Sequence, residues 1–157
     1  MPVDDADFKL AMSQFASGVT VVTTEHENKP YGLTVASFAS LSLHPPLVLV
    51  CVEKAVKSHD ALLASKKFGI SILGSDQTEI SKRFASKSDD KFSGIITDRG
   101  QLGVPLIKEA LCTIECRLRD QLPGGDHSIF IGEVVDVKVR EGAPLVYFRS
   151  GYRQINA

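Results

Sequence analysis

The segment "LTVASFASLSL" gathers hydroxyl side chains into a short stretch of chain. Thr34, Ser37, Ser40 and Ser42 fall within nine residues, with alanines between them. Short side chains let a ligand approach the backbone closely and leave backbone N–H groups free to donate hydrogen bonds. This pattern suits a planar heteroaromatic ring with carbonyls and ring nitrogens, or an anionic phosphate. The alternative is an edge strand with its hydroxyls in water, and composition alone favours that simpler interpretation.

Three other short segments contain residues that could bind a nucleotide. Lys57 and Ser58 of "KSH" stand at an expected helix start, where free N–H groups suit a phosphate, although helix caps of this kind are common. His127 of "GGDH" begins an expected strand and could reach into a cleft, or it could be an ordinary turn residue. Tyr152 and Arg153 of "SGYRQ" could stack on a ring or pair with a phosphate, or simply pack on the surface.

The sequence contains no pattern for catalysis by side chains alone. No nucleophile stands beside a base, and GxSxG, GxxxxGK[ST] and GxGxxG do not occur. The four histidines lack zinc spacing, so we expect no metal. Cys112 and Cys116 suit apolar packing on one face of a strand. If the protein is an enzyme, its chemistry therefore belongs to a bound cofactor.

Charge and hydropathy exclude several classes of partner. The 157 residues carry 18 basic and 19 acidic side chains, which argues against a nucleic-acid surface. We expect no membrane segment and no signal peptide, because no apolar run is long enough. Three cysteines without CxxC spacing argue against a disulfide framework. The expectation is a cytoplasmic protein with a single domain, residues 1–157.

The elements that must position these residues are mostly strands. The first expected helix covers 4–17 and is ended by Gly18. Two short helices are expected further along the chain. One follows Ser58, which would be its N-cap, and the other follows Ser75. The expected strands are 18–25, 31–43, 47–52 (covered on both faces), 66–73, 110–120, 128–139 and one short strand near the C-terminus. "QLPGGDH" is the expected hairpin connection, and 86–110 is loop-rich. Six or seven strands without alternating helices predict an antiparallel barrel with peripheral helices.

Four blocks, in this order, resemble the flavin reductase-like family: "FASGVTVVTT", "GLTVASFASLSLHPPLVLVCV", "GDHSIFIGEV" and "PLVYFRSGYR". More specifically, the chain resembles the short flavin reductase component of two-component aromatic monooxygenases. The resemblance implies a mainly β fold, an antiparallel Greek-key split barrel that binds FMN or FAD without a covalent bond. It also implies a homodimer, reduction of flavin by NADH or NADPH, and a partner flavin-dependent monooxygenase.

The resemblance implies a role for each candidate site residue. The residues implied to contact the flavin ring and ribityl chain are Thr34, Val35, Ala36, Ser37, Ser40, Leu41, Cys51 and Val52. Those implied to meet the phosphate and the outer part of the flavin are Lys57, Ser58, Arg83, Phe84 and Lys91. Those implied to face the nicotinamide nucleotide are His127, Tyr152 and Arg153.

The implied reaction is hydride transfer from nicotinamide to flavin, which needs stacked rings and no general base. Backbone N–H groups of residues 34–37 would stabilise the negative charge that develops, and His127 would position the nicotinamide. One alternative is a flavin-binding barrel that stores flavin or transfers electrons without free reductase activity. A barrel oxidase acting on a phosphorylated vitamer is a second alternative, against which the sparse basic residues argue.

Overall fold

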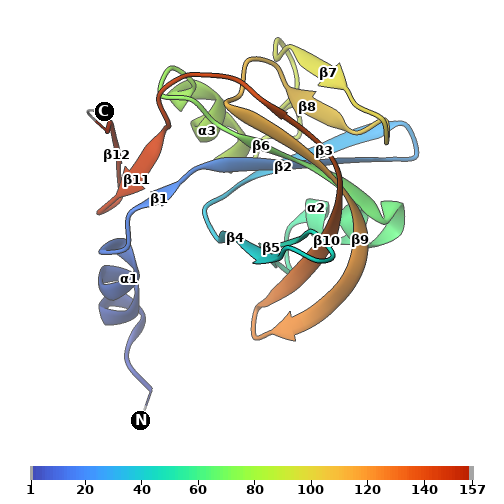
Figure 1. Cartoon of the computed structure of the whole chain (residues 1–157). Coiled ribbons are helices and arrows are strands. Elements are labelled where there is room, and N and C mark those ends of the chain that lie inside the picture. The colour runs from blue at the N-terminus through green and yellow to red at the C-terminus, as the bar shows by residue number, and fades with distance from the viewer. Residues whose placement is uncertain (1, 156–157) are drawn as a thin grey trace.

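The computed structural model describes residues 2–155 (Figure 1). Its helices are α1 (Asp5–Ser13), α2 (Lys57–Ser65) and α3 (Thr78–Ala85). Its strands are β1 (Ser17–Gly18), β2 (Thr20–His26), β3 (Lys29–Val35), β4 (Phe38–Ser42), β5 (Leu47–Glu53), β6 (Lys67–Ile72), β7 (Thr97–Arg99), β8 (Pro105–Ile107), β9 (Cys112–Gly124), β10 (His127–Val139), β11 (Val146–Phe148) and β12 (Gly151–Arg153).

Seven strands form one curved sheet in the order β3-β2-β6-β9-β10-β5-β4, and every neighbouring pair is antiparallel (Figure 1). The predicted antiparallel β class is therefore confirmed. Edge strands β3 and β4 are not paired with each other in this sheet, yet only Ala36 and Ser37 separate them along the chain. The barrel is thus left open beside this link. Two small sheets, β1-β11-β12 and β7-β8, lie outside it.

The barrel is filled by alternate residues of its strands, as period-two side-chain geometry requires. Phe68, Ile70 and Phe130 are completely buried in the main hydrophobic cluster. The prediction that residues 47–52 are covered on both faces is wrong within this chain. Val48, Val50 and Val52 point into the core, whereas the alternating Leu47, Leu49 and Cys51 remain half-exposed. β5 therefore offers a partly open apolar face.

Two helix boundaries differ from the sequence prediction. Helix α1 ends at Ser13, and Gly18 lies in β1, where it pairs with Val146 of β11. The chain leaves the helix early because this strand pairing requires an extended backbone. Helix α2 is capped at Val56, without a side-chain hydrogen bond, so Ser58 is a buried residue of its first turn and not its N-cap.

Two hairpins also differ from the prediction. β9 runs through Pro123 to Gly124, so the turn to β10 consists only of Gly125, with φ of 68°, and Asp126. The C-terminal segment forms two strands, β11 and β12, instead of one. Their turn uses Arg149 and Ser150 at positive φ, a conformation that composition does not signal because glycine usually occupies it.

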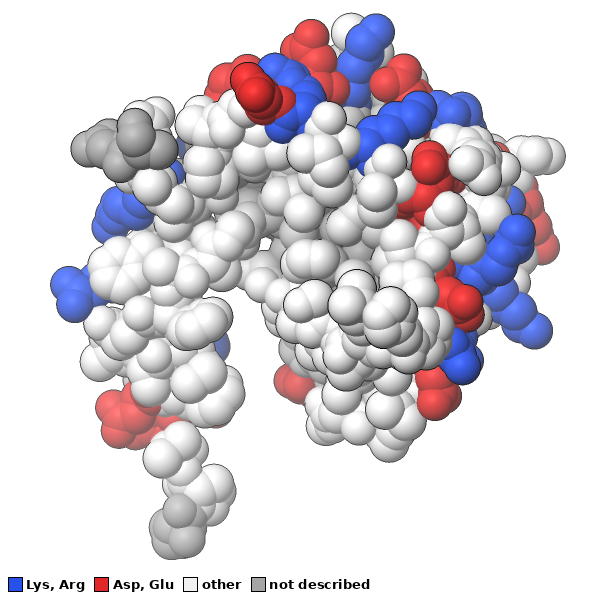
Figure 2. Space-filling model, in the orientation of Figure 1, with Lys and Arg blue, Asp and Glu red and all other residues white. Residues whose placement is uncertain are grey.

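Helix α1 stands apart from the barrel, and none of its residues is buried. The space-filling view shows a hollow between α1 and the barrel that is bordered mainly by uncharged atoms (Figure 2). Large apolar side chains are exposed on and just after the helix: Phe8, Leu10, Met12 and Phe15. None of the helices in residues 2–155 is both long and apolar enough to cross a membrane.

Candidate functional site

An open cleft of about 920 Å³ lies beside the opening in the barrel. One wall is β3 with the link 36–37. The other elements are the end of β5, the start of α2, the end of α3 and the loop 86–92. The volume is at the upper end of the range of about 300–1,000 Å³ for small-molecule sites, so a nucleotide-sized ligand fits the space.

The structure brings ten of the predicted site residues together around this cleft and leaves six outside it. Those that line it are Thr34, Val35, Ala36, Ser37, Cys51, Lys57, Ser58, Phe84, Lys91 and His127. Those that do not are Ser40, Leu41, Val52, Arg83, Tyr152 and Arg153. Val52 faces the core, and Ser40 and Leu41 are exposed on β4.

The link between β3 and β4 offers backbone donors to the cleft. The Thr34 hydroxyl donates to the carbonyl of Ser81 at 2.6 Å, and the Ser37 hydroxyl donates to the carbonyl of Cys51 at 3.2 Å. These hydroxyls therefore hold the fold. The N–H groups of Ala36 and Ser37 donate to no other group of residues 2–155, and both residues are exposed. They remain available for acceptors on a ligand.

The start of α2 forms the polar end of the cleft. The N–H groups of a first helical turn have no partner within the helix, and no side chain caps this one. The hydroxyl of Ser58 makes no hydrogen bond within residues 2–155, although the residue is 6% exposed and lines the cleft. Lys57 adds a positive charge at the same point. Together these groups form a site suited to a phosphate.

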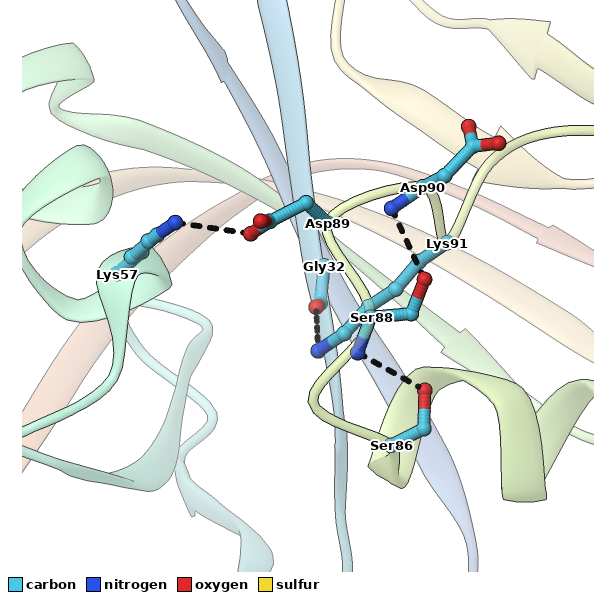
Figure 3. A network of polar contacts seen from close by, with 7 residues as sticks. All are labelled: Gly32, Lys57, Ser86, Ser88, Asp89, Asp90 and Lys91. Carbon is cyan, nitrogen blue, oxygen red and sulfur yellow. Dashed lines mark hydrogen bonds and ion pairs between the residues drawn. The ribbon is translucent and has the colours of Figure 1, made fainter.

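The loop 86–92 forms the wall that sequence reasoning largely missed, since only its Lys91 was a candidate (Figure 3). The ammonium of Lys91 donates to the carbonyls of Gly32, at 3.0 Å, and Phe84, at 3.1 Å. Burial lowers the pKa of Lys91 from its ordinary value. Lys91 therefore anchors the loop to β3 and α3, and its charge is used within the fold.

His127 opens β10 at the rim of the cleft. Its Nδ1 lies 2.7 Å from Oδ1 of Asp126, and its side chain is 44% exposed. The hydrogen bond to His127 lowers the pKa of the Asp126 carboxyl. The carbonyl of Asp126 also accepts from the N–H of Lys54 at 2.9 Å, which ties this turn to the end of β5. The imidazole is thus oriented through one nitrogen, leaving Nε2 for a ligand.

The three arginine and tyrosine candidates outside the cleft have structural partners or lie in solvent. The hydroxyl of Tyr152 lies 2.7 Å from that of Ser81 in α3. Arg83 donates to the carbonyl of Asp90 at 3.1 Å, and so supports the loop 86–92 from behind. Arg153 is exposed on β12. Their predicted ligand contacts are untested predictions.

An open antiparallel barrel with this cleft defines a class of β-barrel proteins suited to a nucleotide-sized ligand. The model of the flavin reductase like domain matches residues 12–156, and the chain belongs to that family. The chain is 41% identical, over 96% of its length and 81% of the relative's, to the reductase component of 4-nitrophenol 4-monooxygenase/4-nitrocatechol 2-monooxygenase from Rhodococcus opacus.

Two solved structures show the same fold over nearly the whole chain. The flavin reductase PheA2 in its native state superimposes with a TM-score of 0.93, at 39% identity over 99% of this chain and 100% of its own. The NADH:FAD oxidoreductase SgcE6 from Streptomyces globisporus C-1027, in complex with NAD and FAD fragments, superimposes with a TM-score of 0.91, at 36% identity over 99% and 97%. The predicted family, barrel class and flavin oxidoreductase activity are confirmed.

Proposed function

We propose that this protein reduces FMN or FAD with NADH or NADPH and supplies the reduced flavin to a partner flavin-dependent monooxygenase. The observation that carries the proposal is the cleft itself. It joins free backbone donors at Ala36 and Ser37 to an uncapped helix start at Lys57 and Ser58, whose groups suit a phosphate. The relatives named as monooxygenase reductase components support the same proposal.

The cleft residues divide the work of binding and orientation. The link 36–37 would donate hydrogen bonds to the carbonyl side of the flavin ring, where negative charge develops on reduction. Lys57, Ser58 and the first turn of α2 would hold the phosphate. His127, fixed by Asp126, would position the nicotinamide. The bound flavin supplies the hydride acceptor, so no side chain needs to act as a general base.

We also propose a homodimer that uses the apolar face of α1. No residue of helix α1 is buried in its own chain, and the sheet strand β10 exposes Val135, Val137 and Val139. Exposed apolar surfaces of this kind mark interaction sites in soluble proteins. A second copy of this chain is the occupant that we propose.

All three cysteines are free, which agrees with the predicted cytoplasmic location.

The test is NADH and NADPH oxidation by the purified protein with FMN and with FAD, in all four combinations. We expect turnover that depends on both substrates, and the four rates decide the preferred pair. A protein with no turnover in any combination would refute the proposal. A yellow protein that keeps its flavin through dialysis and ignores both nucleotides would support the storage or electron-transfer alternative.

A further inference from the structure

An ion pair lies at the polar end of the cleft. Nζ of Lys57, at the start of α2, lies 2.8 Å from Oδ1 of Asp89 in the loop 86–92 (Figure 3). Both residues line the cleft, and their side chains are 71% and 76% exposed. The cation proposed for the flavin phosphate therefore already has an anionic partner from the protein itself.

The position of Asp89 is determined by the structure of its loop. The hydroxyl of Ser86 accepts from the N–H of Ser88, and the hydroxyl of Ser88 accepts from the N–H of Asp90 at 3.1 Å (Figure 3). On the other side of Asp89, Lys91 anchors the loop to β3. These contacts on both sides of Asp89 hold its backbone opposite α2, so its carboxylate is presented to Lys57.

Both members of the pair are charged at neutral pH. Asp89 raises the pKa of Lys57, and Lys57 lowers the pKa of Asp89, in each case mainly through their hydrogen bond. A phosphate that approaches Lys57 must replace this carboxylate and also meets its negative charge. Because ion pairs between exposed side chains are weak, the exchange is readily reversible.

We propose that Asp89 competes with the flavin phosphate for Lys57 and thereby sets how long the cleft retains flavin. This inference rests on the proposed function, since it concerns the same phosphate site. A reductase that supplies flavin to a second protein must release it, and a competing carboxylate within the protein speeds that release. Asp89 is thus a residue that determines affinity for phosphorylated flavin and not for the ring.

The experiment compares FMN with riboflavin, which has the same ring and ribityl chain but no phosphate. Dissociation constants are measured by fluorescence titration for the wild type, Asp89→Asn, Lys57→Met, the double variant and Asp90→Asn. We expect Asp89→Asn to bind FMN about three- to tenfold more tightly and riboflavin equally well. Stopped-flow dissociation of FMN should slow by a similar factor. Asp90→Asn, an adjacent exposed carboxylate that does not line the cleft, is the matched control and should leave both constants unchanged.

The double variant separates competition from simple repulsion. If Asp89 competes for Lys57, most of the gain from Asp89→Asn should disappear in the Lys57→Met background. Three outcomes would each overturn the inference. The gain in FMN affinity could persist undiminished in the Lys57→Met background. Asp89→Asn could bind FMN no more tightly than the wild type, or its affinity for riboflavin could change by the same factor. Failure of the proposed function looks different, because the wild type would then show no flavin-dependent oxidation of NADH or NADPH, whatever its dissociation constants for FMN and riboflavin.

Discussion

The phenol oxygen of Tyr152 lies 2.7 Å from the hydroxyl oxygen of Ser81. Ser81 is fully buried, and its carbonyl accepts from the Thr34 hydroxyl on the cleft wall. This chain of contacts ties β12 to α3 and α3 to β3. The sequence suggested a ligand contact for Tyr152, whereas the geometry gives its hydroxyl a partner within the protein.

We therefore expect Tyr152→Phe to act on stability more than on nucleotide binding. Loss of the hydroxyl should lower the free energy of unfolding by about 1 kcal/mol, because Ser81 loses a buried hydrogen-bond partner. The Michaelis constant for the nicotinamide nucleotide should stay within about twofold of the wild type. Urea unfolding and steady-state kinetics measure the two effects. An unchanged stability with a large rise in that Michaelis constant would restore the ligand-binding role.

His127→Ala should weaken the binding of the nicotinamide nucleotide more than the binding of flavin. A positioning residue that contacts one substrate contributes mainly to the binding of that substrate. We therefore expect the Michaelis constant for the nicotinamide nucleotide to rise about tenfold. Separate titrations of FMN binding should change by less than about threefold. Asp126→Asn keeps an oxygen acceptor beside Nδ1 of His127. Its Michaelis constant for the nicotinamide nucleotide should therefore lie between those of the wild type and His127→Ala. A collapse of kcat with both constants unchanged would instead point to proton transfer by the imidazole.

The three cysteines should differ in alkylation, and flavin should protect only one of them. Cys51 lines the cleft and is half-exposed, so bound FMN should shield it. Cys116 is fully buried, and burial raises its pKa to about 12, which keeps it a thiol at pH 8. Burial also raises the pKa of Cys112. Mass spectrometry after brief iodoacetamide treatment, with and without FMN, checks this order. Protection of Cys112 instead of Cys51 would place the ligand elsewhere.

Gly100→Ala should destabilise the protein without changing either substrate constant. A methyl group at this position would collide with the carboxylate of Glu115. That carboxylate is buried and accepts from the N–H groups of Gln101, at 3.0 Å, and Leu102, at 2.9 Å. The overpacked variant should lose about 2 kcal/mol of unfolding free energy. Gly18→Ala, where nothing lies within reach of the added carbon, is the control and should change it by less than about 0.5 kcal/mol.

The proposed dimer predicts that a charge on the apolar surface formed by α1 and the segment just after it produces monomers. Phe15 is 81% exposed in the single chain, and Phe15→Glu should shift the sedimentation coefficient from the dimer value to the monomer value. Lys9→Gln, a change at an exposed polar position of α1, should leave the dimer intact. A dimer that survives Phe15→Glu and also Phe8→Glu would exclude α1 from the interface.

Side-chain types along the sequence predicted the elements that depend on local composition. The β-branched run 18–25 became β2, and the two long C-terminal strands became β9 and β10. Ends were less predictable. Val56 gives no capping signal, and the β11–β12 turn contains no glycine at its positive-φ positions.

The cleft was predictable where it follows one continuous segment and not where it depends on distant contacts. The hydroxyls of Thr34 and Ser37 stood out by composition, which alone favoured a solvated edge strand. The resemblance to the family then implied the ligand-binding role of residues 34–37. The loop 86–92 becomes a wall only because Lys91 reaches the carbonyl of Gly32, which is 59 residues away. Likewise, the hydroxyl of Tyr152 has a partner in Ser81, 71 residues away, and no local pattern could indicate that pairing.

The pairing of β1 with β11 fixes an order in time. The arm formed by residues 5–18 is synthesised well before its strand partner at Val146 and Tyr147. At ribosomal rates of about 5–20 residues per second, the two are separated by several seconds to about half a minute. Until Val146 and Tyr147 have been made, the arm has no partner strand in its own chain. Pairing of β1 with β11 must therefore follow synthesis of almost the whole barrel.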